Sequence, residues 1–493
     1  MAPGQLRLPA GSDAAAVRIT GLTADSREVR PGFLFAALSG LRQDGASFIP
    51  EALRRGAVAI LSAPEARDAV PAEAVWLADA EPRRRLALLA ARFFGRQPAR
   101  VVAVTGTNGK TSTAVFTQGI WASLGLAAAS LGTLGLLGFA LPAAAAVPAM
   151  TTPDPVALQR GLSVLADAGC DRLAMEASSH GLAQFRLDGV TVAGAAFTNL
   201  TRDHLDYHGS MAAYRDAKLR LFDTLLSADG TAVVDLDAAG DISGAVAAIA
   251  ARRGQRLLRY GTAPEAELHI AALRPHSDGT DLDLDLFGTR HSLTLPLIGG
   301  FQLRNALAAL SLVLGTEAGL EPGQAVAALR GLHGVPGRMQ KVASRGDRAV
   351  YVDYAHTPDA LRTVLDAARP HCRGRLHVVF GAGGDRDPGK RPQMGRAAAE
   401  LADRVIVTDD NPRSEAPAAI RAAILDAAPE ATEIGDREAA IAAALDGMGA
   451  GDLLILAGKG HETGQVVAGR VLPFDDAEVA RRLAAARGWE VLA

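Results

Sequence analysis

The sequence has few cysteines, few aromatic residues and no excess of either charge. Cys170 and Cys372 are its two cysteines in 493 residues, too few and too far apart for a disulfide framework or a zinc cluster, so we expect a protein of the reducing cytoplasm. Lys plus Arg number 51 against 54 for Asp plus Glu, and the net charge of -3 excludes a globally basic nucleic-acid-binding protein. Aromatic residues make up 4% and hydrophobic residues 49%, which suits a folded, alanine-rich α/β chain and excludes general disorder.

The chain is too long for one hydrophobic core. Its 493 residues predict about three domains at roughly 150 residues each. A linker is indicated at Arg96-Gln97-Pro98, and a glycine-proline cluster at residues 334–337 marks a second boundary. We therefore predict domains at residues 1–97, 98–336 and 337–493.

One long uncharged stretch resembles a membrane span. Residues 111–153 contain no charged side chain, and residues 120–141 are enough to cross a bilayer, which takes about 20 residues. Glycines interrupt this stretch, however, and they favour a buried helix followed by a core strand and a loop. We therefore expect no membrane span.

A glycine-rich loop follows an apolar strand predicted at residues 100–105 and precedes a helix predicted at residues 112–123. The loop reads Gly106-Thr107-Asn108-Gly109-Lys110-Thr111. Amides at a helix start can surround phosphate oxygens, Lys110 can reach the β- and γ-phosphates, and the Thr111 hydroxyl can ligate Mg²⁺. Val104 stands where the strict motif has its first glycine, and an ordinary glycine turn with a surface lysine is the alternative.

Two further clusters contain metal-ligating residue types. Glu176 follows a buried strand predicted at residues 173–175, where its carboxylate could complete a Mg²⁺ shell with phosphate and water oxygens. Residues 198–208 include His204, and Lys218 and Phe222 follow on a predicted helix. A solvated strand end, a polar loop and a surface lysine are the respective alternatives.

Four predicted strands of the third domain each run into a polar or glycine-rich loop. They cover residues 349–352, 376–380, 405–407 and 453–456, and helices alternate with them. Such alternation predicts a mostly parallel sheet, which binds ligands beyond the carboxyl ends of its strands. The four loops are therefore expected at one edge of the sheet.

Several motifs in fixed order resemble the Mur ligase family. They cover residues 105–111, 176–182, 198–209 and 214–218, and further matches run from Asp25-Ser26-Arg27 to the loop at Gly458. The family's phosphate loop is a shortened variant, which accounts for Val104. The resemblance implies an α/β protein of three domains: a small α/β N-terminal domain for a UDP-sugar, a central P-loop mononucleotide-binding domain with a parallel sheet, and a C-terminal Rossmann-like domain for an amino acid.

The resemblance also implies ATP as co-substrate and Mg²⁺ as cofactor. Lys218 matches a lysine that is carbamylated in the family, and a carbamate would turn a cation into an oxygen ligand for Mg²⁺. Catalytic roles are implied for Lys110, Lys218 and His204. The implied metal ligands are Thr111, Glu176, His204 and Lys218 as N6-carboxylysine. The implied ATP-binding residues are Gly106, Thr107, Asn108, Gly109, Lys110, Thr111, Asn305, Arg338 and Asp353.

A site for the nucleotide-sugar dipeptide is implied in the first two domains. Its residues are Ser26, Leu41, Arg42, Gln43, Thr151, Thr152, Ser178, Gln184 and Arg186. Taken alone, Asp25-Ser26-Arg27 could equally form a turn or a helix cap.

The loop at residues 410–413 resembles the signature of family members that add meso-diaminopimelate, whereas members that add lysine have a different residue in place of Arg413. Diaminopimelate carries one carboxylate more than lysine, and a guanidinium can bind that group bidentately. The implied pocket residues are Arg386, Asp410, Asn411, Pro412, Arg413, Gly458 and Glu462, with Glu462 binding the ammonium.

The resemblance therefore predicts an ATP-dependent amide ligase of peptidoglycan precursor synthesis. We expect it to add meso-diaminopimelate to UDP-N-acetylmuramoyl-L-alanyl-D-glutamate through an acyl phosphate, as a cytoplasmic monomer with small-molecule substrates and no nucleic-acid partner. A family member that adds lysine or acts on a folate-like substrate is one alternative. A nucleotide-regulated binding or motor protein is the alternative from another class.

Overall fold

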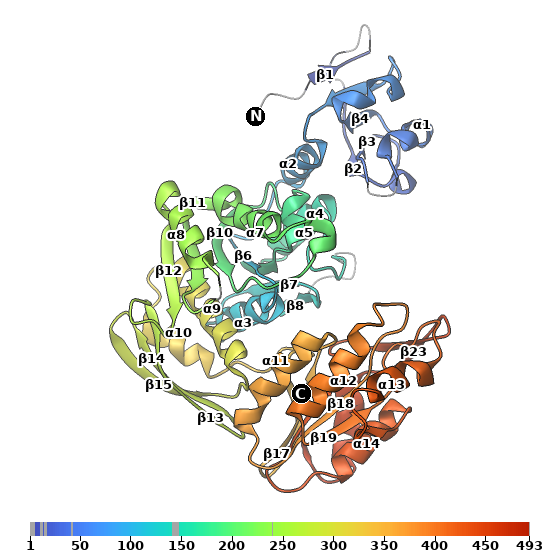
Figure 1. Cartoon of the computed structure of the whole chain (residues 1–493). Coiled ribbons are helices and arrows are strands. Elements are labelled where there is room, and N and C mark those ends of the chain that lie inside the picture. Colours follow the sequence, from blue (N-terminus) through green and yellow to red (C-terminus); the bar gives the residue numbers. More distant parts are fainter. Residues whose placement is uncertain are drawn as a thin grey trace. The chain divides into compact units, whose positions relative to one another are not determined.

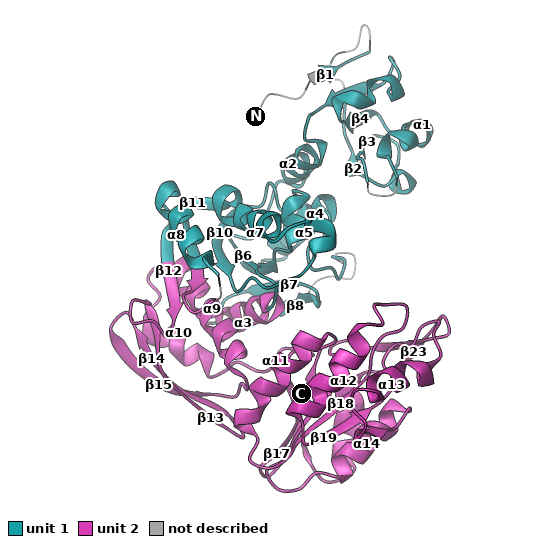
Figure 2. Cartoon of the chain, in the orientation of Figure 1, with its two compact units in different colours: residues 1–108, 125–232, 239–257 teal, residues 109–124, 233–238, 258–493 magenta. Residues whose placement is uncertain are grey.

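The computed structural model describes residues 5–9, 13, 17–40, 43–140, 147–238 and 240–492. The chain forms two compact units (Figure 2). Unit 1 comprises residues 1–108, 125–232 and 239–257, and unit 2 comprises residues 109–124, 233–238 and 258–493. In the described part of the chain no helix is long and apolar enough to cross a membrane, and the uncharged stretch instead forms helix α3 (Lys110–Ser123) and strand β7 (Ala128–Gly132), as predicted.

The first sheet of unit 1 is N-terminal and has helices on both faces. Its strand order is β1-β5-β4-β3-β2, in which β1 (Gln5–Arg7) is antiparallel, while β2 (Gly21–Thr23), β3 (Phe33–Ala37), β4 (Ala59–Ser62) and β5 (Val75–Ala78) run parallel. Helix α1 (Ile49–Arg54) packs on one face. Helix α2 (Pro82–Phe94) packs on the other through Leu86 and Ala90, which lie four residues apart on one side of the helix.

The second sheet of unit 1 brings three loops to one edge (Figure 1). Strand β6 (Arg100–Thr105) lies between β9 (Arg172–Glu176) and β10 (Val192–Phe197), and all three are parallel. Strand β7 follows beside β9, and β8 (Gly135–Leu137) closes this side antiparallel. Thr105 pairs with Phe197, and Val104 with Glu176, so the segments after these strands start at the same level. The strands predicted at residues 100–105 and 173–175 are confirmed.

Helices α4 (Pro155–Asp167), α5 (Ser179–Ala183), α6 (Leu205–His208), α7 (Met211–Arg220) and α8 (Ile242–Arg253) complete unit 1. The predicted helix with Lys218 and Phe222 is only partly correct, because α7 ends at Arg220 and a π-helical turn covers Leu221–Leu225. The wider turn leaves the Phe222 carbonyl outside the α-helical ladder, and the buried Gln255 side chain donates a hydrogen bond to it at 3.0 Å. Strand β11 (Leu226–Asp235) then carries the chain into unit 2.

In unit 2, helix α3 packs along α9 (Gly300–Thr316), and α10 (Pro322–Leu329) lies beside both. Strand β12 (Arg256–Gly261) leads into an antiparallel ribbon of β13 (Leu268–His276), β14 (Gly279–Leu286) and β15 (Thr289–Leu295). Side chains alternate along β14, and Leu282, Leu284 and Leu286 are buried on one of its faces.

The C-terminal sheet of unit 2 has the order β20-β19-β18-β21-β17-β16-β24. Strands β17 (Arg348–Asp353), β18 (Leu376–Phe380), β19 (Arg404–Val407), β20 (Thr432–Glu433) and β21 (Leu453–Ala457) are parallel. Strand β16 (Gln340–Arg345) is antiparallel to β17, and the short edge strand β24 (Glu490–Val491) is antiparallel to β16. The four predicted strands are confirmed, as is the mostly parallel sheet.

Helices cover both faces of this sheet. Side chains alternate along β17, so Tyr351 faces α11 (Pro358–Ala368), α12 (Lys390–Leu401) and α13 (Pro417–Leu425), while Val350 and Val352 face α14 (Arg437–Asp446) and α15 (Asp476–Ala485). A separate hairpin is formed by β22 (Gly464–Val467) and β23 (Arg470–Pro473). The α/β fold class predicted from the sequence is therefore confirmed.

Candidate active site

The first half of the glycine loop is held by the end of β10 in unit 1. Gly106 has a φ of 149°, and a Cβ atom there would lie 1.9 Å from the Thr198 hydroxyl, so a side chain does not fit. The Thr107 amide donates to the Asn199 carbonyl at 2.9 Å, and the Asn108 amide donates to the Asn199 side chain at 3.0 Å. Thr198 and Asn199, the first residues of the predicted cluster at 198–208, therefore support the glycine loop.

The second half of the loop begins helix α3 in unit 2. Gly109 is the N-cap residue with a φ of 85°, and Lys110 and Thr111 form the first turn. Asn305 of α9 lies against the loop, since a Cβ on Gly109 would be 2.3 Å from its amide oxygen. Amides at the start of a helix carry partial positive charge, so this end of α3 is suited to an anionic ligand such as a phosphate.

Glu176 is a buried carboxylate beside strand β6. Its side chain accepts hydrogen bonds from the Thr133 amide at 2.8 Å and the Thr133 hydroxyl at 3.2 Å. A Cβ on Gly132 would lie 2.1 Å from the carboxylate, so the end of β7 packs closely against the Glu176 side chain. The strand-end position predicted for Glu176 is confirmed, but its environment is enclosed rather than solvated.

Lys218 is buried and points at the glycine loop, so the alternative of a surface helix lysine is wrong. Its ammonium donates to the Gly106 carbonyl at 2.7 Å and lies 4.5 Å from the centre of the Tyr214 ring. The Tyr214 hydroxyl in turn contacts the Thr107 hydroxyl at 3.1 Å. A residue 112 positions along the chain thus contacts the first glycine of the loop.

Three histidines cluster beside Lys218. The His180 ring lies 4.8 Å from that of His204 and 5.5 Å from that of His208, and Tyr207 packs on His180 at 4.1 Å. Burial, followed by the neighbouring His204, lowers the pKa of both His180 and His208. His204 has a left-handed backbone with φ 52° and contacts Asp203 at 3.4 Å.

Two of the predicted metal ligands, Glu176 and Lys218 of unit 1, have side chains that could contribute to a magnesium site completed by substrate phosphates. No group of three or more His, Cys, Asp and Glu residues in the described ranges is arranged to hold a metal on its own. Mg²⁺ needs no such group, because it commonly takes one or two carboxylates and fills its octahedron with water and phosphate oxygens. Glu176 can supply the carboxylate, whereas Lys218 could contribute oxygen only as a carbamate.

The residues predicted for the muramoyl dipeptide lie together next to Glu176. The Thr152 hydroxyl donates to the Glu176 carbonyl at 3.1 Å and accepts from the Ser178 amide at 3.0 Å. Arg186 donates to the Thr152 carbonyl at 2.7 Å and to the Gln184 side chain at 2.8 Å. Thr151 contacts the Thr133 hydroxyl at 2.9 Å. Burial lowers the pKa of Arg186.

The predicted UDP-sugar residues are only partly described. Leu41 and Arg42 lie outside the described residues. The Gln43 carbonyl accepts a hydrogen bond from the Gly40 amide at 2.9 Å. Asp25 caps a 3₁₀ turn over Ser26–Glu28 and binds Arg27, so the motif forms a capped turn, and its predicted UDP-binding role stays a prediction. Ser26 itself is buried.

The residues predicted for the adenosine side of ATP are connected within unit 2. Asn305 donates to Gln302 at 3.0 Å, and Gln302 donates to the Arg338 carbonyl at 2.7 Å. The Arg338 guanidinium stacks on the Tyr354 ring at 4.5 Å. Asp353 is buried and accepts from the amides of Met339 and Ala355, and burial raises its pKa to about 6 despite the nearby Arg338.

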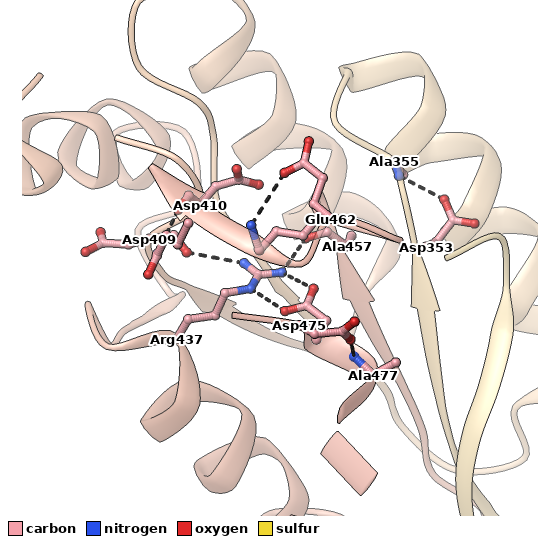
Figure 3. Close-up of polar contacts among 12 residues, drawn as sticks. Asp353, Ala355, Asp409, Asp410, Arg437, Ala457, Glu462, Asp475 and Ala477 are labelled. Atoms are coloured by element: carbon pink, nitrogen blue, oxygen red, sulfur yellow. Dashed lines mark hydrogen bonds and ion pairs between the residues drawn. The ribbon is translucent and has the colours of Figure 1, made fainter. Parts of the chain in front are cut away.

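The predicted amino-acid residues meet at the carboxyl ends of β18, β19 and β21. Asp410 lies against Gly458, where a Cβ would be 2.5 Å from its carboxylate, and Asn411 donates to Glu462 at 2.8 Å. Figure 3 shows Asp410 and Glu462 on neighbouring loops. Arg413 adopts a left-handed backbone with φ 53°, and its guanidinium donates to the Gly384 carbonyl at 2.6 Å.

The rest of this set lies around the same loop. The Pro412 carbonyl approaches Gly384 so closely that a Cβ there would be 2.0 Å from it. A Cβ on Gly383 would lie 3.8 Å from the Arg386 side chain and 3.0 Å from the Arg413 guanidinium. Two arginines and two acidic residues are therefore carried by loops at the same edge of the sheet, a donor set suited to a zwitterionic amino acid.

Sequence reasoning assigned no role to several residues that support these sites, namely Thr133, Gln302, Tyr214, Arg437 and Lys459. Thr133 and Gln302 are ordinary polar residues, and nothing local distinguishes them. Lys459 had a visible signal, because the chain contains only five lysines, which are Lys110, Lys218, Lys341, Lys390 and Lys459.

A glycine loop at a helix start, a buried carboxylate on the neighbouring strand β9 and a second sheet whose strands end in charged loops are features of a nucleotide-binding α/β enzyme. Family models bear out this class. The Mur ligase family catalytic domain matches residues 18–94, the Mur ligase middle domain residues 104–313, and the Mur ligase glutamate ligase domain residues 337–460.

Relatives of known name are similar over nearly the whole chain. The UDP-N-acetylmuramoyl-L-alanyl-D-glutamate--2,6-diaminopimelate ligase of Bradyrhizobium diazoefficiens is 49% identical, covering 98% of this chain and 99% of the relative. The enzyme of the same name from Caulobacter vibrioides is 52% identical over 95% of this chain and 96% of its own. A solved structure of a UDP-N-acetylmuramoyl-L-alanyl-D-glutamate--2,6-diaminopimelate ligase has a TM-score of 0.72 at 35% identity, with 95% of each chain covered.

A more distant structure, the MurF ligase of Thermotoga maritima in complex with ADP, shares the fold with a TM-score of 0.59 at 20% identity, covering 96% of this chain and 98% of its own. The chain belongs to the Mur ligase family. It is an ATP-dependent ligase that forms amide bonds, and the alternative of a binding or motor protein is wrong.

Proposed function

We propose that this ligase joins meso-diaminopimelate to the D-glutamyl residue of UDP-N-acetylmuramoyl-L-alanyl-D-glutamate. The observation that carries this proposal is that the loops at one sheet edge carry Arg386 and Arg413 together with the carboxylates of Asp410 and Glu462. The names of the relatives at 49% and 52% identity support the same substrate pair.

The reaction divides into two displacements. A D-glutamyl carboxylate oxygen attacks the γ-phosphorus of ATP, the bond to the β-phosphate oxygen breaks, and ADP leaves. The neutral amine of diaminopimelate then attacks the carbonyl carbon of the acyl phosphate, inorganic phosphate leaves, and the amine loses its proton as the amide forms. Positioning and charge stabilisation supply much of the rate in such phosphoryl transfers.

The residues divide between the two steps. The amides of residues 106–111 and the Lys110 ammonium hold the ATP phosphates, and Asn305, Arg338 and Asp353 hold the adenosine side. Thr151, Thr152, Ser178, Gln184 and Arg186 place the dipeptide next to Glu176, and Ser26 with residues 41–43 binds the UDP group. Arg413 and Arg386 bind the far carboxylate of diaminopimelate, and Glu462 binds its far ammonium. We assign these roles to domains at residues 1–97, 98–336 and 337–493.

We propose Mg²⁺ as the cofactor, held by Thr111, Glu176, His204 and a carbamylated Lys218. When bound, it would neutralise charge on the transferring phosphoryl group. Lys218→Ala should lose nearly all ligase activity, and short carboxylates such as acetate should restore part of it by filling the space of the missing carbamate. Undiminished activity of Lys218→Ala, measured by phosphate release with all substrates present, would refute the carbamate role.

We further propose that the protein acts in peptidoglycan precursor synthesis as a monomer in the cytoplasm, where ATP and the nucleotide-sugar are available. Light scattering behind size exclusion would test the monomer.

An amino-acid panel tests the function itself. Purified protein, ATP, Mg²⁺ and UDP-N-acetylmuramoyl-L-alanyl-D-glutamate are combined with meso-diaminopimelate, lysine or ornithine, and phosphate release is followed together with the mass of the product. Phosphate release and a tripeptide product with meso-diaminopimelate are expected. Preference for lysine would refute the substrate assignment, and ATP hydrolysis without a peptide product would refute ligation of these substrates.

A further inference from the structure

Lys459 is a fully buried lysine in the loop that also carries Gly458 and Glu462, two of the residues predicted to bind the amino-acid substrate. It follows Gly458 at the end of β21, and its side chain has 0% exposure. Its ammonium donates to the Gly464 carbonyl at 2.6 Å and lies 3.4 Å from Oε2 of Glu462. Burying an ammonium is costly unless it is hydrogen-bonded and paired, so these two contacts are what make a lysine tolerable here.

Lys459 and Asn411 together hold one orientation of Glu462. Oε2 of Glu462 lies 3.4 Å from the Lys459 ammonium and accepts a hydrogen bond from the Asn411 side-chain amide at 2.8 Å. These two contacts fix the position of one carboxylate oxygen. Oε1 makes no hydrogen bond within the described part of the chain, and the Glu462 side chain is 34% exposed. The second oxygen is therefore left for an external cation.

The same lysine supports the loop that carries Asn411. Gly464 begins strand β22, and two residues further on the Val466 amide donates to the Asn411 side chain at 2.8 Å. Lys459, Glu462, Asn411 and the start of β22 thus form a closed ring of contacts. An apolar side chain at position 459 would leave both Glu462 and the Gly464 carbonyl without this partner.

We propose that Lys459 is a positioning residue that presents Oε1 of Glu462 to the ammonium of the incoming amino acid and so sets its affinity. This rests on the proposed function, in which Glu462 binds the far ammonium of diaminopimelate. Lys459 does not contact the reacting atoms itself. Its loss should therefore weaken binding of the amino acid while leaving the phosphate-transfer chemistry intact.

The test compares Lys459→Gln and Lys459→Met with wild type and with Lys341→Met as a matched control. Lys341 pairs with Asp278 at 3.4 Å on strand β16, apart from the pocket residues. Glutamine can still donate to the Gly464 carbonyl but lacks the charge that faces Glu462. The measured quantities are kcat, the KM for each of the three substrates, and the melting temperature.

Both Lys459 variants should raise the KM for meso-diaminopimelate about tenfold, the low end for a charged hydrogen bond, with kcat within threefold and the KM for ATP unchanged. Lys341→Met should match wild type. In a Glu462→Gln background the further rise caused by Lys459→Gln should fall below threefold, because both substitutions remove the same contact.

A folded Lys459→Gln protein whose KM for meso-diaminopimelate stays within twofold of wild type would overturn the inference. Equal increases in the KM values of ATP and the amino acid would also overturn it, since they would indicate a general structural effect. The wild-type panel separates this failure from that of the proposed function. If wild type uses lysine instead, the proposed function fails, and the KM for lysine in the same variants then decides the role of Lys459.

Discussion

The Arg437–Asp476 ion pair offers the sharpest test of how the amino-acid pocket is held. Both side chains have 0% exposure, and Arg437 donates to the two Asp476 carboxylate oxygens at 2.7 Å each. It also donates to the Ala457 carbonyl at 3.0 Å and the Asp409 carbonyl at 3.4 Å, so the guanidinium joins the ends of β21 and β19 (Figure 3).

Asp476→Ala would leave this guanidinium buried without its counterion. Breaking a buried pair from one side costs about 3–5 kcal/mol of unfolding free energy. Replacing both partners by apolar residues, in Arg437→Met with Asp476→Leu, removes the stranded charge and should recover at least half of that loss. Because Asp409 and Ala457 directly precede Asp410 and Gly458, Asp476→Ala should also raise the KM for the amino acid.

A second, exposed ion pair between helices α14 and α15 serves as the control for the buried pair. Arg482 and Glu438 join the same two helices at 2.7 Å, but their side chains are 57% and 45% exposed. Glu438→Ala should therefore barely change the unfolding free energy. Urea unfolding followed by circular dichroism measures all variants. Equal losses of unfolding free energy in Asp476→Ala and Glu438→Ala would refute the reasoning. So would an Arg437→Met, Asp476→Leu double variant that is no more stable than Asp476→Ala.

Three further predictions concern the other sites. Arg413→Ala should reduce the preference for meso-diaminopimelate over lysine by about 10- to 150-fold, the range of a lost charged hydrogen bond, and an unchanged ratio of kcat/KM values would exclude this role. Gly106→Ala should abolish ATP-dependent turnover because its Cβ would overlap the Thr198 hydroxyl, whereas Gly323→Ala, with nothing within 4 Å, should retain full activity in the phosphate-release assay. Burial raises the pKa of Asp353 from 3.8 to about 6, so below pH 6 the folded state binds a proton that the unfolded state has released, and stability should fall as pH rises from 4 to 6, by up to about 3 kcal/mol. Urea unfolding of Asp353→Asn over the same pH range should lack this slope, and parallel curves for the two proteins would contradict the assignment.

Local patterns predicted the strands and the loops that follow them. Residues 100–105 form β6 as expected, and the four C-terminal strands lie where apolar runs end in polar residues. This succeeds because a strand buried on both faces must be apolar along its whole length, while ligand-binding loops must be polar. The helix prediction around Phe222 was only partly correct, because α7 continues there as a π-helical turn, and the side chain that bonds the Phe222 carbonyl, Gln255, lies 33 residues away.

Patterns alone could not decide between functional and ordinary roles for single residues. Lys218 by itself suggested a surface lysine, and its burial against the Gly106 carbonyl depends on the packing of α7 against the glycine loop. The closed environment of Glu176 depends on Thr133, 43 residues earlier, in a segment without any motif. The motif resemblance identified most of these positions, but it could not supply their partners.

The sequence by itself determined the class of fold, the glycine loop and the polar edge of the C-terminal sheet, because strand periodicity and loop chemistry are local properties of the chain. The tertiary structure alone decided which side chains are buried, which oxygen of Glu462 is held by Lys459, and how Arg437 joins the ends of two strands. These features arise from contacts between residues far apart in sequence or from the shape of a loop, and only the packed chain brings such groups within hydrogen-bonding distance.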